Sequence, residues 1–160
     1  MFSFLRRLLP ALSVLALLGA GIAHAAEPVN TLEKGLFGFK ASGVAIRGYD
    51  TVAYWTENRP VEGDENITSD YTGATWRFAS ADNKALFDGD PEKYAPQYGG
   101  YCAYGVAKDG LVKIEPENFT ILDGKLYLNY DDGVQGLWEA DIPDFIRQAD
   151  RKFEGLLAAE

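Results

Sequence analysis

The clearest local pattern in the sequence is a pair of β-type runs joined by a two-residue turn. Residues 119–122 and 125–130 are rich in aromatic and aliphatic side chains, and Asp123-Gly124 lies between them. An Asp-Gly pair readily adopts the positive φ angles of a tight hairpin turn. The pattern therefore predicts an antiparallel hairpin in the second half of the chain, which restricts the fold to those that contain a paired sheet.

A second hairpin is predicted upstream by the same reasoning. Residues 67–71 and 74–78 are strand-like runs separated at Thr72-Gly73, and within each run alternate side chains share one face. Ser80 then follows as a suitable N-cap for a short helix, because its side chain can accept a hydrogen bond from the first helical turn. The order hairpin then helix is therefore expected here.

Helical spacing and caps predict the remaining elements. Asp141 precedes an apolar stripe at steps of three and four, which indicates a C-terminal helix that frays near Gly155. A helix is also expected over residues 97–107, and residues 26–42 are expected to form an irregular arm packed on the domain.

Together these elements predict an α+β domain. A small antiparallel sheet of two hairpins is covered by several short helices and a C-terminal helix. The expected organisation is a signal peptide at residues 1–25, an N-terminal arm at 26–43, and a domain at 44–157 whose core is 48–105. No internal repeat is evident in the sequence.

The first 25 residues have the layout of a cleavable export signal. The basic pair Arg6-Arg7 precedes an apolar run at residues 8–22, and Ala23-His24-Ala25 forms a small-residue cleavage site. The apolar run is shorter than the roughly 20 residues that span a bilayer. The sequence therefore predicts a periplasmic or secreted protein with no stable membrane insertion after cleavage behind Ala25.

The charge balance narrows the class of partner. The chain has 15 Lys+Arg against 24 Asp+Glu, a net charge of −9. Loss of the signal removes Arg6 and Arg7 and no acid, so the charge of the mature chain becomes −11. This balance argues against nucleic acid or an anionic membrane as partner. Solubility of an exported protein explains the acidity more simply than an acidic docking face does.

The supply of histidine and cysteine excludes several chemistries. The single histidine, His24, lies in the signal, and Cys102 is the single cysteine. Nucleophile systems with an imidazole base need histidine, and the common zinc and copper sites need imidazole or several thiolates. What remains is carboxylate chemistry, a hard cation on oxygen ligands, one thiolate, or an organic ligand held by aromatic and polar groups.

Over residues 44–156 the sequence resembles the exported bacterial branch of the YHS domain proteins. The motifs that carry the resemblance are Gly48-Tyr49-Asp50, Val52-Ala53-Tyr54, Phe78-Ala79-Ser80, Asp90-Pro91, Gly99-Gly100-Tyr101-Cys102-Ala103 and Asp123-Gly124-Lys125-Leu126-Tyr127-Leu128-Asn129. The resemblance implies a small module that is suspected of binding metal in several relatives. In the metal-type relatives two cysteines stand where this chain has Ala79 and Asn83. The resemblance therefore implies a soft-metal role here only through Cys102, and the metal is unknown.

Five residues are the candidates for a ligand site: Cys102, Tyr101, Tyr49, Asp50 and Tyr98. A cleft lined by Tyr49, Asp50, Tyr101 and Cys102 is expected. A lone cysteine next to Gly99-Gly100 is most often a buried small hydrophobe. The alternative is a working thiol, since an unpaired cysteine in an oxidising compartment is either sheltered or used.

Two acidic clusters have simpler interpretations than a metal site. In the cluster at residues 88–92, Asp90 acts as a helix cap before Pro91, and the residues of a calcium loop are absent. Asp131-Asp132-Gly133 is interpreted as a turn and the start of a helix.

The leading functional hypothesis is a non-catalytic, exported binding or accessory module for a small ligand, a metal ion or a periplasmic protein. One alternative is a thiol-dependent redox protein or enzyme that uses Cys102. Another is a structural interaction module. No catalytic residue and no particular cofactor are predicted.

Overall fold

The predicted mixture of hairpins and helices is confirmed. The computed structural model describes residues 26–35 and 38–159, so the expected signal peptide lies outside the described residues. In chain order the elements are β1 (Leu32–Gly35), β2 (Gly38–Ala41), the 3-10 turn η1 (Ala45–Gly48), α1 (Ala53–Thr56), β3 (Asp64–Tyr71), β4 (Ala74–Phe78), α2 (Ala81–Gly89), α3 (Pro91–Tyr94), the 3-10 turn η2 (Gln97–Gly100), α4 (Ala103–Ala107), β5 (Phe119–Leu122), β6 (Lys125–Leu128), α5 (Asp132–Glu139) and α6 (Ile142–Ala158).

Both predicted hairpins form, with tight turns at the expected dipeptides. β3 pairs antiparallel with β4 and β5 with β6, each as a sheet of two strands. The φ angles are +50° and +79° at Thr72-Gly73 and +50° and +71° at Asp123-Gly124. Positive φ at both central residues gives the turn a twist that matches the twist of the strands it joins.

A third hairpin corrects the expectation of an irregular arm at residues 26–42. β1 pairs antiparallel with β2, and Glu33 lies opposite Lys40 with an ion pair of 3.4 Å between their side chains. Asn30 anchors this segment, because its backbone N–H donates to Gly99 O (2.8 Å) and its side chain to Gly100 O (2.9 Å). The sequence pattern missed these strands because both are short and rich in glycine and lysine.

The helix expected over residues 97–107 is interrupted, and that prediction was wrong in its middle. Tyr98, Gly99 and Gly100 have φ angles of +55°, +59° and +80°, and Tyr101 is extended. A right-handed helix cannot continue through left-handed residues. The chain therefore forms η2, breaks at Tyr101-Cys102, and starts again as α4. At the C-terminus, α6 continues past Gly155 to Ala158.

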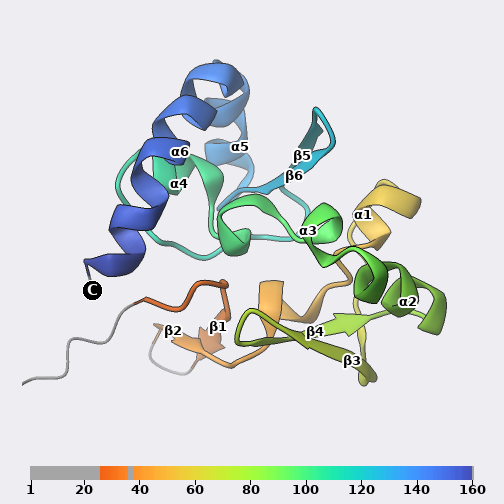
Figure 1. Cartoon of the computed structure of the whole chain (residues 1–160). Helices are drawn as coiled ribbons and strands as arrows, with labels where there is room; N and C mark the ends of the chain where they lie inside the picture. Colours follow the sequence, from red (N-terminus) through yellow and green to blue (C-terminus); the bar gives the residue numbers. More distant parts are fainter. Residues whose placement is uncertain (1–25, 36–37, 160) are drawn as a thin grey trace, which may run out of the picture.

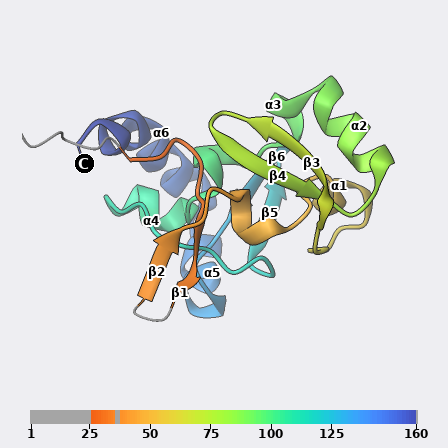
Figure 2. The ribbon, with the colours of Figure 1, turned by 90° about the horizontal axis from the view of Figure 1, so that it is seen from below.

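The order of elements occurs twice in the chain. A 3-10 turn, a short helix, a hairpin and two helices form a first unit from η1 to α3, and the same elements follow from η2 to α6. In each unit the 3-10 turn packs on the second strand of its own hairpin, η1 on β4 and η2 on β6. Figures 1 and 2 show β3, β4, α1 and α2 on one side of the molecule, and α4, α5 and α6 on the other.

Backbone conformation and caps support this equivalence. Ile46, Arg47 and Gly48 have φ angles of +40°, +60° and +81°, close to the three left-handed residues that end at Gly100, 52 positions after Gly48. The helix caps recur at a constant spacing of 51 residues, from Ser80 to Asp131 and from Asp90 to Asp141. The molecule is therefore a structural repeat of two units, although no repeat is evident from the sequence.

Aromatic side chains dominate the core of both units. In the first unit Phe87 contacts Trp76 and Phe78, with ring centroids 5.3 and 5.1 Å apart. In the second unit Trp138 lies 5.4 Å from Tyr127. Trp138 comes 51 residues after Phe87, and both are buried. These aromatic side chains therefore serve packing of the two cores. No helix among residues 26–35 and 38–159 is long and apolar enough to cross a membrane.

Candidate functional site

Asp50, a predicted ligand residue, is fully buried and its carboxylate is occupied by hydrogen bonds. Oδ1 accepts from the backbone N–H groups of Val52 (2.8 Å) and Ala53 (3.3 Å) at the start of α1. Oδ2 accepts from the Ala79 N–H (2.8 Å) and the Asn83 side-chain amide (2.7 Å). A carboxylate has about four acceptor positions, so these donors leave none for a ligand. The two positions that carry cysteine in the metal-type relatives here complete the hydrogen bonding of a buried acid.

Cys102 occupies in the second unit the place that Asp50 occupies in the first. Its Sγ accepts from the Gly105 N–H (3.2 Å) at the start of α4, and its S–H points at Asn129 Oδ1, 3.6 Å away. The backbone N–H of Cys102 donates to Val112 O (3.3 Å), as that of Asp50 donates to Val61 O (2.8 Å). Cys102 is therefore a helix cap within the core, with no exposed surface.

The protonation of Cys102 follows from this burial. Burial raises the pKa of the Cys102 thiol, and the nearby backbone N–H groups of Gly105, Tyr130 and Tyr104 lower it only in part. The thiol is therefore neutral at neutral pH. A reactive or metal-binding cysteine requires the thiolate and access to it, and neither is provided here.

The three candidate tyrosines connect segments that are distant in the sequence. Tyr98 donates its hydroxyl hydrogen to Asp150 Oδ1 (2.8 Å) and Tyr101 to Glu27 O (3.0 Å). Both are buried, at 8% and 5% exposure, whereas Tyr49 is half-buried and its hydroxyl lies 3.4 Å from Glu62 Oε1. Tyr101 lines a pocket of about 200 Å³, but no other candidate residue lines that pocket. The expected cleft at Tyr49, Asp50, Tyr101 and Cys102 therefore does not appear in this pocket.

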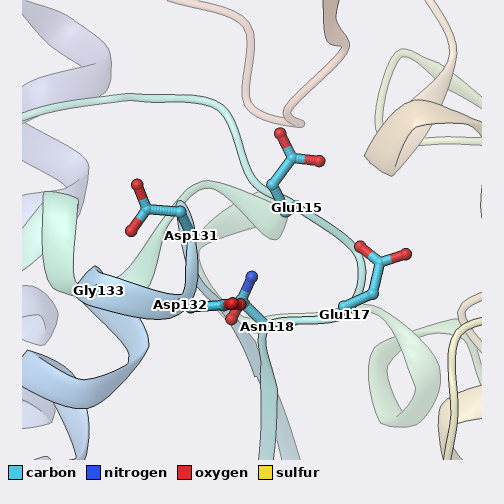
Figure 3. Close-up of a pocket in the computed structure, with 6 residues that line it drawn as sticks. All are labelled: Glu115, Glu117, Asn118, Asp131, Asp132 and Gly133. Atoms are coloured by element: carbon cyan, nitrogen blue, oxygen red, sulfur yellow. The ribbon is translucent and has the colours of Figure 1, made fainter.

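A different pocket lies at the edge of the second unit. It has a volume of about 400 Å³, and four of its six lining residues are acidic (Figure 3). The lining residues are Glu115, Glu117, Asn118, Asp131, Asp132 and Gly133. We call this cavity the acidic pocket.

Local structure explains why these acids gather. The segment before β5 turns back on itself, since Asn118 N–H donates to Glu115 O (3.0 Å). Asn129, at the end of β6, clamps both ends of this turn: its N–H donates to Asn118 O (2.8 Å), and its carbonyl accepts from Glu115 N–H (3.0 Å). Asp131 then caps α5 through the Val134 N–H (2.9 Å). The acids of the loop and of the helix start thus meet at one place.

Asn118 is the unusual member of the acidic pocket. It is only 7% exposed, and its side-chain amide has no hydrogen-bond partner among the described residues. Figure 3 shows this amide directed into the space between Asp131, Glu115 and Glu117. The fully enclosed side-chain polar atoms without a partner among the described residues are Trp55 Nε1 and Trp138 Nε1, so the Asn118 amide is accessible from the pocket and can bond a ligand there.

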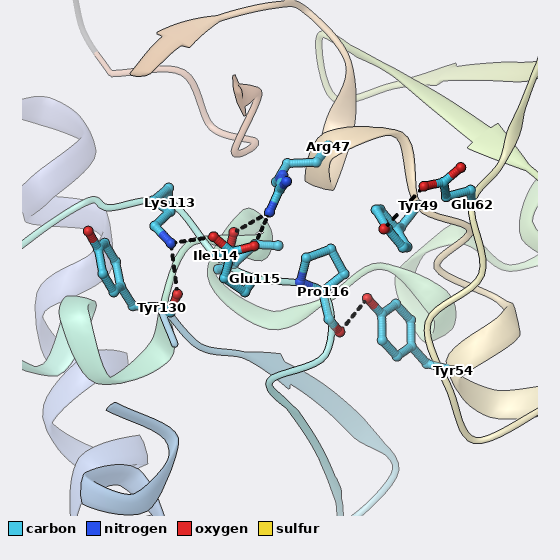
Figure 4. A network of polar contacts seen from close by, with 9 residues as sticks. All are labelled: Arg47, Tyr49, Tyr54, Glu62, Lys113, Ile114, Glu115, Pro116 and Tyr130. Carbon is cyan, nitrogen blue, oxygen red and sulfur yellow. Dashed lines mark hydrogen bonds and ion pairs between the residues drawn. The ribbon is translucent and has the colours of Figure 1, made fainter. Parts of the chain in front are cut away.

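One wall of the acidic pocket is fixed by the first unit (Figure 4). Arg47 donates to the Glu115 carboxylate and to Ile114 O (3.5 Å). Tyr54 donates its hydroxyl hydrogen to Pro116 O (3.0 Å). Lys113 bonds both Glu115 and Tyr130 O (3.0 Å). The segment at residues 113–116 is therefore anchored to the first unit through Arg47 and Tyr54.

These cations determine the charge state of Glu115. Burial raises the pKa of the Glu115 carboxyl, but the hydrogen bonds and positive charges of Lys113 and Arg47 outweigh burial, so the pKa lies below its ordinary value. Glu115 is therefore ionised and neutralised by its own partners. The other acids of the pocket have no basic partner among the described residues.

The sequence interpretation found only part of this pocket. Asp131-Asp132-Gly133 was predicted as a turn and helix start, and the cap made by Asp131 confirms it. Glu115, Glu117 and Asn118 were not singled out. A run of acids around Pro116, directly before a hairpin, was the available signal, but its meeting with Asp131 depends on the tertiary clamp by Asn129.

The described residues do not fit a metal of the kind the resemblance suggests. Soft metals prefer thiolate, thioether or imidazole ligands, and the one described thiol is buried and neutral. Within residues 26–35 and 38–159 no group of three or more histidine, cysteine, aspartate or glutamate side chains is arranged to hold a metal ion.

Comparison with protein families agrees with part of the resemblance. The family model described as YHS domain matches residues 52–98, so a YHS domain is present in this stretch. No curated protein and no solved structure matches the chain. The matched stretch runs from the residue before α1 into η2, which is most of the first unit. The acidic pocket belongs to the second unit, outside the match.

Proposed function

We propose that this protein is an exported, non-catalytic binding module that takes a small ligand at the acidic pocket. The observation that carries the proposal is the Asn118 amide, which is nearly buried, has no partner among the described residues, and faces a cavity of about 400 Å³. Small-molecule sites are commonly cavities of roughly 300 Å³ or more with a few convergent polar groups.

The polar groups of this pocket favour binding over catalysis. General acid and base pairs need two titratable groups whose environments separate their pKa values. In the acidic pocket the hydrogen bonds and positive charges of Lys113 and Arg47 lower the pKa of Glu115, which makes this carboxylate a weaker base. The thiol alternative needs an accessible thiolate, which Cys102 does not supply.

The proposed location of this binding module is a compartment outside the cytoplasm. The proposal rests on the signal-like residues 1–25 and on the burial of the single described thiol, which is sheltered from oxidation. Expression of the full chain in a bacterial host, followed by intact-mass measurement of the periplasmic fraction, tests this. The expected mass is that of a chain beginning at Ala26, and a full-length mass in the membrane fraction contradicts it.

Native mass spectrometry of that purified protein tests ligand binding. We expect a population with an additional small mass that is lost when Glu117→Gln and Asp132→Asn are combined. The matched control is Glu65→Gln, which removes an exposed acid of β3 far from the pocket in sequence. An adduct retained by the double variant, or carried on Cys102, contradicts the pocket as the site.

A further inference from the structure

We propose that the acidic pocket binds an organic cation, with an ammonium or guanidinium group as the recognised chemistry. This inference rests on the proposed function and adds the class of ligand to it. The proposed occupant is a small aliphatic amine or a basic side chain, both of which present the same charged N–H groups.

The negative charge of the acidic pocket is only partly balanced by basic side chains. Arg47 and Lys113 both pair with Glu115. Glu117 and Asp132 are exposed and make no ion pair or side-chain hydrogen bond within the described part of the chain. A cavity lined by charge of one sign concentrates ligands of the opposite sign. The net charge of −9 for the whole chain acts in the same direction.

The position of Asn118 also favours an organic cation. Its amide lies between carboxylates and has no partner within the part of the chain that the structure describes (Figure 3). An asparagine side chain offers both a carbonyl oxygen and an NH₂ group, and rotation of the amide plane exchanges them. With the oxygen turned toward the pocket, Asn118 can accept from a ligand N–H while Glu117 and Asp132 supply charge. The Asn118 oxygen therefore orients the N–H group of the ligand, and the two carboxylates attract its positive charge.

The size of the acidic pocket also favours an organic cation over a metal ion. Calcium takes six to eight oxygens at about 2.3–2.6 Å, so it requires acids that converge on one point. The described acids do not converge in this way, since no group of three is arranged for a metal ion. They surround a space of about 400 Å³ instead. A cation with a carbon skeleton and several N–H donors fits that space better than a bare ion does.

Isothermal titration calorimetry of the full-chain protein tests the proposal. The probes are 1,4-diaminobutane, agmatine, a capped Gly-Lys-Gly peptide, calcium chloride and sodium phosphate. We expect the amines to bind more tightly than calcium, and phosphate not to bind. Glu117→Gln and Asp132→Asn each remove one carboxylate charge from the pocket, so each should weaken amine binding about tenfold. Glu65→Gln should leave it unchanged.

Asn118 is tested by a conservative pair. Asn118→Asp adds an acid of the same shape and should retain or strengthen amine binding, whereas Asn118→Leu should weaken it about tenfold. Far-ultraviolet circular dichroism checks that both variants fold. Weaker binding by Asn118→Asp, with an intact fold, contradicts the proposal.

The other possible results distinguish a failure of the organic-cation proposal from a failure of the proposed ligand-binding function. Binding of the peptide without the free amines keeps the chemistry and assigns the cation to a partner protein. Binding of calcium or phosphate that Glu117→Gln alters, without amine binding, overturns the organic cation and leaves the pocket as a ligand site. Absence of binding by every probe, together with an absence of adducts in native mass spectrometry, removes both proposals.

Discussion

Asp50 and Cys102 show how one backbone position serves two chemistries. Each is buried and follows a Gly-Tyr pair; Asp50 accepts from N–H groups at the start of α1, and Cys102 is the N-cap of α4. Asp50 receives four hydrogen bonds, whereas Cys102 is a neutral thiol beside Asn129. The motif residues that were predicted to form a ligand site therefore stabilise the fold through buried hydrogen bonds.

Thiol chemistry gives a direct prediction at this scale. Because Cys102 is fully buried and its pKa is raised, the native protein should react with iodoacetamide at pH 8 at least about a hundredfold more slowly than the same protein in urea. Mass spectrometry at timed intervals measures both rates. Reaction of the native protein at the unfolded rate contradicts a capping role and restores the thiol alternative.

Individual residues were predicted unevenly from the sequence. The sequence motifs predicted Asp50 and Cys102 as ligand residues, and only the fold shows that Asn83 and Ala79 satisfy Asp50. Asn118 carries no sequence signal at all. Its importance comes from being nearly buried without a partner, which is a tertiary property.

At the scale of secondary-structure elements, most of the turns and helix starts depend on interactions between residues that are close in the sequence. The two turns with positive φ and the caps Ser80, Asp90 and Asp141 were predictable because each depends on neighbours within a few residues. The break in the helix expected over residues 97–107 was not predictable from the sequence, because Tyr98 adopts a left-handed conformation that a tyrosine side chain does not favour. Packing of η2 on β6 supports that conformation.

Substitution of two glycines that have open space around them tests the effect of backbone strain on stability without a change in packing. Gly124 has φ +71°, Gly136 lies within α5, and a Cβ at either position meets no atom within 4 Å. Gly124→Ala should lower the free energy of unfolding by about 1–2 kcal/mol, because a left-handed alanine is strained. Gly136→Ala should raise it by about 0.5–1 kcal/mol, because alanine favours the helix.

Urea unfolding followed by circular dichroism measures both changes. The two substitutions add the same methyl group, so each is the control for the other. Equal effects of the same sign would show that the turn conformation of β5 and β6 contributes nothing to stability.

On the scale of the whole molecule, the repeat places two aromatic cores side by side and shelters several weak acids. Burial raises the pKa of Tyr54 in the first unit and of Tyr98 in the second, where a hydrogen bond to Asp150 adds to the effect. Burial also raises that of Cys102. All three are therefore neutral in the folded protein at a pH where the unfolded chain ionises.

The consequence is a loss of stability in alkali. Below about pH 8.5, the ordinary pKa of cysteine, both states hold these protons and stability is full. As the pH rises through 8.5 and then 10, the unfolded chain releases protons that the folded protein retains, so the free energy of unfolding falls. The slope is about 1.4 kcal/mol per pH unit for each group ionised only in the unfolded state.

Urea midpoints at pH 7, 9 and 10.5 check this expectation. Cys102→Ser is the control, since it should flatten the first part of the decline and leave the tyrosine part. A midpoint that is constant to pH 10.5 contradicts the burial of these groups.

The repeat itself was hidden from the sequence because the units share conformation more than residues. Gly48-Tyr49 and Gly100-Tyr101 recur, but Asp50 is replaced by Cys102, and α3 of four residues corresponds to α6 of 17. The side chains at equivalent positions differ between the two units, whereas the turns and helix caps occupy equivalent positions. The acids at the two helix starts also differ, since Asp131-Asp132 stands where the first unit has Ser80-Ala81, and Gly133 stands where it has Asp82.

The acidic pocket can be examined most directly by nuclear magnetic resonance of the isotopically labelled protein during titration with 1,4-diaminobutane. If the second unit binds an organic cation there, the side-chain NH₂ signals of Asn118 and the backbone amides of Asp132 and Gly133 shift together and saturate. Shifts centred on Tyr101 and Cys102, or none beyond those in Glu117→Gln protein, would contradict it.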